Sequence, residues 1–93
     1  MNRVISFAAL RKFWSVYPET EASLKSWYEY IKEAEWETPV DVKKSFRNAS
    51  ILKKCRVVFN IKGNNYRLVV KINYEYQIMW IRFIGTHADY DKI

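Results

Sequence analysis

The residues from Val57 to Tyr90, VVFNIKGNNYRLVVKINYEYQIMWIRFIGTHADY, decide the fold of this 93-residue chain. Three apolar stretches alternate here with two groups of turn-forming residues. Gly63-Asn64-Asn65 predicts a tight turn, because Gly and Asn tolerate the positive φ angles that hairpins need. Asn73-Tyr74-Glu75-Tyr76 predicts a second turn, with a weaker signal. The segment therefore predicts three short antiparallel strands joined by two turns.

Alternation along the last two of these strands predicts which side chains share a face, because successive residues of a strand point to opposite sides. One set is expected to pack against the core: Leu68, Val70, Met79, Ile81 and Phe83. The opposite face then carries Arg67, Lys71, Trp80 and Arg82, with Ile84 beside them. An antiparallel sheet can leave one face open to solvent. Cations and an aromatic ring on such a face suit an RNA backbone.

The residues before this segment predict one short strand and three helices. Arg3–Ile5 reads as an edge strand. Helical spacing of apolar residues then predicts helices over residues 7–17, 20–34 and 39–46, with Ser6, Thr20 and Thr38 as N-caps. The order β-α-α-α-β-β-β favours an α+β fold with the helices packed on one face of a small sheet. A length of 93 residues predicts one domain spanning 1–93.

Positive charge is concentrated in the strand half of the chain. The net charge is +6, and residues 42–93 alone hold eleven Lys/Arg and three Asp/Glu, a balance of +8. Such asymmetry favours a polyanionic partner or an acidic protein partner. A basic surface that serves only solubility is the alternative explanation of this charge, and the sequence leaves both open.

Other features of composition exclude several classes of protein. No apolar run approaches the roughly 20 residues of a membrane span, and no signal peptide is apparent, so we expect a cytoplasmic protein. Cys55 is the only cysteine, which excludes an internal disulfide and agrees with a reducing compartment. One Cys and one His cannot form the usual zinc site. We therefore expect neither a metal nor a cofactor.

The remaining chemistry is that of Arg, Lys, His and Tyr on an open face. The sequence contains no phosphate-binding loop, no GxGxxG and no nucleophile elbow around a serine. Basic side chains with a histidine can cleave RNA without a metal, because the 2′-hydroxyl attacks the adjacent phosphate. A base accepts its proton, cations stabilise the transition state, and an acid protonates the departing 5′-oxygen.

Two motifs resemble a known family. FNIKGNNYRL (59–68) and IRFIGTHADYDKI (81–93) are similar to the signature of the HigB toxins, in the RelE-like superfamily of bacterial toxin–antitoxin systems. The helices before them also resemble that family, so the likeness covers nearly the whole chain. It implies the RelE-type microbial ribonuclease fold and endonucleolytic cleavage of mRNA in the ribosomal A site. It also implies a HigA-type antitoxin with a helix-turn-helix, through which alone the complex would bind operator DNA.

The resemblance implies catalytic roles for four residues. Arg67 and Arg82 match arginines that lie against the scissile phosphate in relatives, where a guanidinium fork suits two phosphate oxygens. His87 matches a histidine that acts as acid or base in some relatives. Tyr90 matches a C-terminal tyrosine near the nucleotide. The superfamily varies in its general base, so that role stays open here.

RNA binding is expected to involve further residues. Lys62, Lys54 and Arg56 resemble strand lysines that contact phosphate in relatives, and Lys71 and Trp80 share the open face. Each has an alternative role: the cations as solvated surface charge, and Trp80 as a ring covered by a helix or a partner. Two other functions stay open, a non-catalytic RNA- or ribosome-binding module and a domain that only binds an antitoxin.

Overall fold

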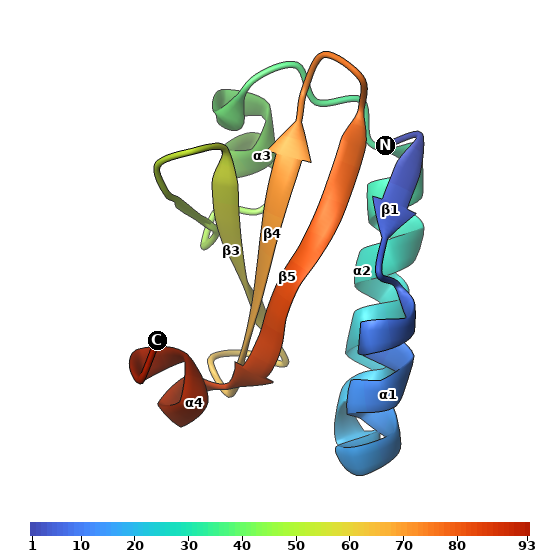
Figure 1. Ribbon diagram of the computed structural model, residues 1–93, viewed down its shortest axis with the longest axis vertical. Helices are drawn as coiled ribbons and strands as arrows, with labels where there is room; N and C mark the ends of the chain where they lie inside the picture. The colour runs from blue at the N-terminus through green and yellow to red at the C-terminus, as the bar shows by residue number, and fades with distance from the viewer.

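The computed structural model describes residues 1–93 and contains one five-stranded sheet with helices against it (Figure 1). In chain order the elements are β1 Arg3–Ile5, α1 Ala8–Val16, the 3₁₀ turn η1 Pro18–Thr20, α2 Glu21–Glu33, α3 Pro39–Ser45, β2 Ser50–Ile51, β3 Arg56–Ile61, β4 Tyr66–Asn73, β5 Ile78–Thr86 and α4 His87–Asp91. The expected α+β class is confirmed. The two-residue strand β2 and the short helix α4 are additions to the expected order.

The strand order in the sheet is β1-β5-β4-β3-β2. The pairs β2–β3, β3–β4 and β4–β5 are antiparallel. Strand β1 lies at the edge as expected, but it pairs with β5 in parallel, so the sheet is mixed. No hairpin links these two strands. The long connection through the helices leaves the direction of β1 free, whereas the tight turns force β3, β4 and β5 to alternate.

One cluster of 17 buried residues fills the space between the helices and one face of the sheet. Leu24, Trp27 and Ile31 enter it from α2, and Leu68 and Val70 enter it from β4. The hairpin of α1 and α2 runs along the sheet beside β1 (Figure 1). The aromatic side chains of α1 and α2 therefore pack in or against this core, and the opposite face of the sheet is met by the short helix α4 at the end of β5.

Helix starts follow the predicted caps only in part. Thr38 begins α3 as expected, with Pro39 in the first turn and the Thr38 N–H donating to Asp41 Oδ2 at 3.2 Å. Ser6 does not cap α1, because it adopts a left-handed φ of 71° and Phe7 takes the N-cap position. Thr20 does stand at the N-cap of α2, but its hydroxyl donates to the Tyr17 carbonyl at 2.7 Å.

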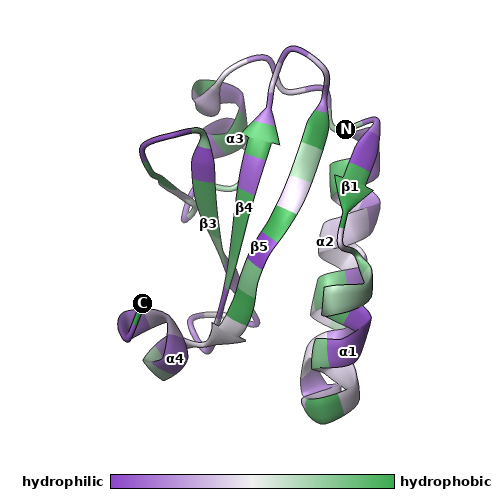
Figure 2. Cartoon of the chain, in the orientation of Figure 1, coloured by the Kyte–Doolittle hydropathy of each residue, from purple (hydrophilic) through white to green (hydrophobic).

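A β-bulge in β5 corrects the expected assignment of faces. Val70 pairs with Ile81 and Val69 pairs with Phe83, so Arg82 is an extra residue between the two pairs. The extra residue reverses the alternation after it. Phe83 was expected in the core but shares the open face with Val69, and Ile84 was expected on the open face but packs against the core. Hydrophilic bands interrupt the apolar strands β4 and β5 in Figure 2.

None of the helices is long and apolar enough to cross a membrane.

Candidate nucleic-acid interface

The face of the sheet opposite the helices carries three rows of side chains set by the strand register. Across β3, β4 and β5 the rows are Arg56–Lys71–Trp80, Val58–Val69–Phe83 and Asn60–Arg67–Gly85. Successive rows are two residues apart, or roughly 6.6 Å along a strand. An apolar middle row therefore lies between two rows that contain cations.

A basic hollow opens on this face. It has a volume of about 470 Å³ and is lined by Lys54, Arg56, Val69, Lys71, Arg82, Phe83 and Ile93. Val69, only 5 % exposed, is the most buried of these side chains. None of the four cationic groups forms an ion pair, since the ion pairs of the chain are Lys25–Glu21, Lys32–Glu29 and His87–Asp91. Unpaired cations around a hollow raise the local concentration of anions.

Local backbone features place these cations. Lys54 and Cys55 adopt left-handed φ angles of 61° and 62° in the loop between β2 and β3. Such a conformation costs roughly 1–2 kcal/mol for an L-residue. Two hydrogen bonds hold the loop: the Leu52 N–H donates to Arg56 O, and the Ile72 N–H donates to Cys55 O, both at 2.9 Å. The loop thus brings Lys54 beside β4, while the bulge directs Arg82 into the same hollow.

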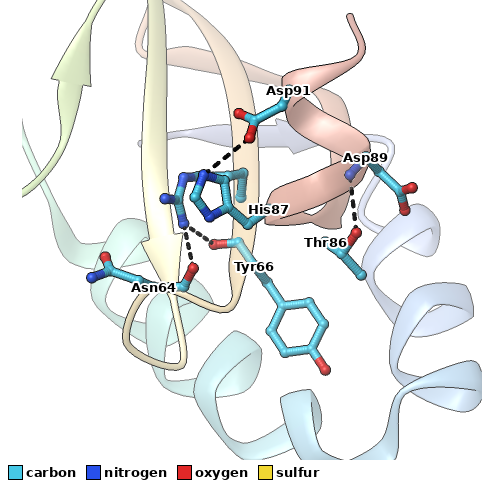
Figure 3. A network of polar contacts seen from close by, with 7 residues as sticks. Asn64, Tyr66, Thr86, His87, Asp89 and Asp91 are labelled. Carbon is cyan, nitrogen blue, oxygen red and sulfur yellow. Dashed lines mark hydrogen bonds and ion pairs between the residues drawn. The ribbon is translucent and has the colours of Figure 1, made fainter.

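A second group of polar residues, which we call the His87 corner, consists of Asn64, Arg67, His87 and Asp91 (Figure 3). Arg67 Nη1 donates to Asn64 O at 2.8 Å, which holds its guanidinium against the turn between β3 and β4. The backbone N–H of His87 donates to Asn65 O at 3.0 Å. His87 Nε2 lies 3.3 Å from Asp91 Oδ2, and the imidazole remains more than half exposed.

The start of α4 orients His87. Thr86 stands at the N-cap, where its hydroxyl oxygen accepts a hydrogen bond from the Asp89 N–H at 3.0 Å. The helical spacing of four residues then puts His87 and Asp91 on one side of α4. The Nε2 side of the imidazole therefore faces the Asp91 carboxylate, and Nδ1 lies on the opposite side of the ring. This arrangement can perform acid–base chemistry at the open face.

Phe83, Gly85 and Tyr90 lie between the basic hollow and the His87 corner. Phe83 lines the hollow, and Gly85 pairs with Arg67 of the corner. The ring of Phe83 covers Gly85 and lies 6.4 Å, centroid to centroid, from the ring of Tyr90. The two groups are therefore neighbours along one face, joined by an aromatic pair.

The structure brings together some of the residues proposed from sequence and separates others. Lys54, Arg56, Lys71 and Arg82 share the basic hollow, and Trp80 flanks it in the row of Lys71. Arg67 and His87 do not line that hollow. Their strand positions place them about one row away, at the end where β5 meets α4.

Lys62 lies elsewhere. It occupies the turn after β3 with a left-handed φ of 51° and lines a separate hollow of about 570 Å³ between α2 and the end of β3. That hollow is larger than the basic hollow, but its lining contains Lys62 as its one charged side chain, with serine, aromatic and other apolar residues around it. It lacks the grouped cations that a phosphate chain needs.

Sequence reasoning missed Phe83 and Asp91 as candidate site residues. Simple alternation put Phe83 in the core, although a glycine inside a strand, here Gly85, often signals a bulge or a close approach. The spacing of His87 and Asp91 is that of a helical ion pair, so it could have been found once a C-terminal helix was considered.

A hydrogen bond on the helical side anchors the strand that carries Arg67. The Tyr66 hydroxyl donates to Glu19 Oε2 at 2.5 Å, which joins the start of β4 to η1. This bond stabilises the phenol and the carboxylate, so it raises the pKa of Tyr66 to about 12 and lowers the pKa of Glu19. Phe13 and Tyr17 pack edge-on against the Tyr66 ring. The start of β4, which lies beside the His87 corner, is thereby held in place.

Comparison with known proteins identifies relatives of this chain. Residues 20–93 match the HigB toxin family, described as the RelE-like toxic component of a toxin–antitoxin system. The chain is 32% identical over 92 residues to the mRNA interferase HigB of Escherichia coli O6:H1, covering 97% of this chain and 89% of that protein. It is 29% identical over 90 residues to the mRNA interferase toxin HigB of Escherichia coli K12, covering 95% and 86%.

Proposed function

This chain belongs to the HigB family of RelE-like toxins, and from that premise we propose that it is an endoribonuclease that cuts mRNA and so inhibits translation. One observation carries the proposal: four cations without ion-pair partners surround a single hollow on the open face. Relatives that bear the name mRNA interferase support the choice of substrate. An RNA strand laid along this face would run from the basic hollow to the His87 corner.

The proposed chemistry requires no metal. The 2′-oxygen attacks the adjacent phosphorus as its proton passes to a base, and the bond from phosphorus to the 5′-oxygen breaks as that oxygen gains a proton. The products are a 2′,3′-cyclic phosphate and a free 5′-hydroxyl. His87 transfers the protons, because a neutral imidazole has one nitrogen that accepts a proton and one that donates. Arg82 and Arg67 stabilise the charge on phosphorus, and Tyr90 lies beside the nucleotide.

We further infer the setting in which the protein acts. The substrate is mRNA in the A site of a translating ribosome, in the cytoplasm. A HigA-type helix-turn-helix antitoxin neutralises the toxin, and operator DNA is bound only through the antitoxin complex. Membership in a family of toxin–antitoxin toxins supports this setting.

A second candidate function is a non-catalytic RNA- or ribosome-binding module. The separation of the basic hollow from Arg67 and His87 favours it, because a binding module needs the cations but not the imidazole. A domain that only binds an antitoxin is a third candidate.

Expression in a bacterial host, with primer extension on cellular mRNA, separates these functions. The proposed toxin arrests growth and produces codon-linked cuts whose 3′ ends carry 2′,3′-cyclic phosphate. Arrest without cuts would support the binding module, and the absence of both would support the antitoxin-binding domain. A magnesium requirement in the chemical step itself would contradict the metal-free mechanism.

A further inference from the structure

We propose that the ring of Phe83 is a nucleobase subsite: one base of single-stranded RNA stacks on it while the neighbouring phosphates contact Lys71 and Arg82. This inference rests on the proposed function for its ligand, RNA, and adds a place where a base is held. Residues that bind only phosphate position a strand, whereas contacts to a base can select among sequences. Phe83 is therefore a candidate determinant of where the RNA is cut.

The backbone of β5 sets the position of the Phe83 ring. The bulge at Arg82 turns Phe83 away from the core and onto the face that carries Val69. Gly85, two residues later, leaves room for the ring, because a Cβ at that position would lie 2.6 Å from the ring Cζ. Tyr90 closes the far side at 6.4 Å between ring centroids. The ring is thus half-buried, supported from below and beside, and it lines the basic hollow.

The lining of the hollow is chemically complementary to a nucleotide. Three of its lining side chains are apolar, namely Val69, Phe83 and Ile93, and the other four are cationic. No acidic residue lines it. A base presents a flat π-face that stacks on an aromatic ring, and its phosphates carry the negative charge that four cations attract. A volume of about 470 Å³ falls within the range of small-ligand sites.

An acidic peptide would match the same charges, but the backbone around the hollow favours RNA. Extended peptides usually gain affinity by adding a strand to an exposed sheet edge. Lys71 and Val69 belong to β4, which is hydrogen-bonded to β3 on one side and β5 on the other. The hollow therefore lies over the interior of the sheet, where no free edge can receive a peptide.

The test measures the binding of two dye-labelled, ten-nucleotide 2′-O-methyl RNAs by fluorescence anisotropy at low salt. One carries all its bases, and the other carries abasic residues throughout. Blocking the 2′-oxygen prevents cleavage, so binding is measured apart from activity. Wild type is expected to bind the base-bearing RNA roughly 5- to 150-fold more tightly, as one stacked base predicts.

Variants then locate the stacking. Phe83→Leu is expected to reduce that preference by at least fivefold, Phe83→Tyr is expected to retain it, and both keep the salt dependence of wild type because no cation changes. The matched control is Tyr76→Leu, which removes an exposed aromatic ring from the loop between β4 and β5. It is expected to leave both affinities unchanged.

Several results would overturn the subsite. Equal binding of the two RNAs by wild type would leave the hollow as a site for phosphate alone, even if the protein cuts mRNA. An unchanged preference in Phe83→Leu would place stacking elsewhere. Tighter binding of an alternating Glu-Leu decapeptide, lost in Phe83→Leu, would make the hollow a protein-docking site. Failure of wild type to bind either RNA would remove both the subsite and the main support of the proposed function.

Discussion

The ring of Phe83 lies so close to Gly85 that a Cβ on residue 85 would approach the ring Cζ to 2.6 Å, well inside van der Waals contact. Gly85→Ala is therefore expected to push the ring out of place and lower the free energy of unfolding by about 1–3 kcal/mol. Urea unfolding of the purified protein measures this. Phe83→Leu in the same chain should recover part of the loss, and a Gly85→Ala variant as stable as wild type would contradict the close packing.

The His87 corner predicts a loss of catalysis without a loss of fold. His87→Asn removes proton transfer, and the cleavage rate is expected to fall by about 10²- to 10⁴-fold. The side chain is more than half exposed, so the unfolding midpoint should stay near that of wild type. Primer extension on a defined mRNA measures the rate, and circular dichroism checks the fold. Undiminished cleavage by His87→Asn would remove the imidazole from the mechanism.

Asp91 should act through His87 and not on its own. The ion pair between them is exposed, and exposed pairs contribute little. Asp91→Asn is therefore expected to reduce cleavage only a few-fold, with no further loss when it is combined with His87→Asn. An additive loss in the double variant would show that Asp91 acts independently of the imidazole.

The Tyr66–Glu19 hydrogen bond predicts a stability difference that depends on pH. The lowered pKa of Glu19 means that its contribution is present above its unfolded value of 4.5 and is lost as the pH falls through the folded value. The raised pKa of Tyr66 means that its contribution is present below pH 10 and is lost as the pH rises from 10 to about 12.

Tyr66→Phe should consequently unfold at a lower urea concentration than wild type near neutrality, with the two curves converging in acid and in strong base. The comparison of midpoints across pH measures this directly. A constant difference at every pH would mean that the hydroxyl does not bond a carboxylate.

Lys62 and Lys71 predict different effects on RNA binding. Lys71 lines the basic hollow and Lys62 lines the hollow beside α2. Lys71→Ala is expected to weaken binding of single-stranded RNA and to reduce the slope of log affinity against log salt by about 1. Lys62→Ala, which removes the same charge, should change neither. The reverse result would move the RNA path to the helical side of the sheet.

The sequence was sufficient for the fold class and for most of the core. Alternation in β4 and the Gly63-Asn64-Asn65 turn are local signals, and both elements were confirmed, although the positive φ angles of the turn fall on Lys62 and Gly63 and not on the asparagines. Alternation failed only in β5, because one extra residue reverses every later side chain and hydrophobicity alone does not mark where a bulge occurs. The parallel pairing of β1 depends on a long-range contact that no local pattern encodes.

The sequence predicted which types of residue form the candidate site better than it predicted how they are grouped in space. Charge asymmetry pointed to the strand half, and the motif around His87 pointed to one family. Grouping Lys54 with Arg82 requires the strained loop before β3 to meet the bulge of β5. The alternation of side chains along a strand could not predict this grouping, and it could not show that Arg67 lies outside the basic hollow.

Cations on the open face are proposed to carry out RNA cleavage, and removal of matched pairs of charges separates their role from that of charges elsewhere on the protein. The double variant Lys71→Ala/Arg82→Ala and the control Lys12→Ala/Lys44→Ala each lose two positive charges. Lys12 lies on α1 and Lys44 on α3, and both are exposed. Primer extension on the same mRNA should show that the first variant no longer cuts while the control cuts like wild type. Equal cleavage by the two variants would contradict the claim.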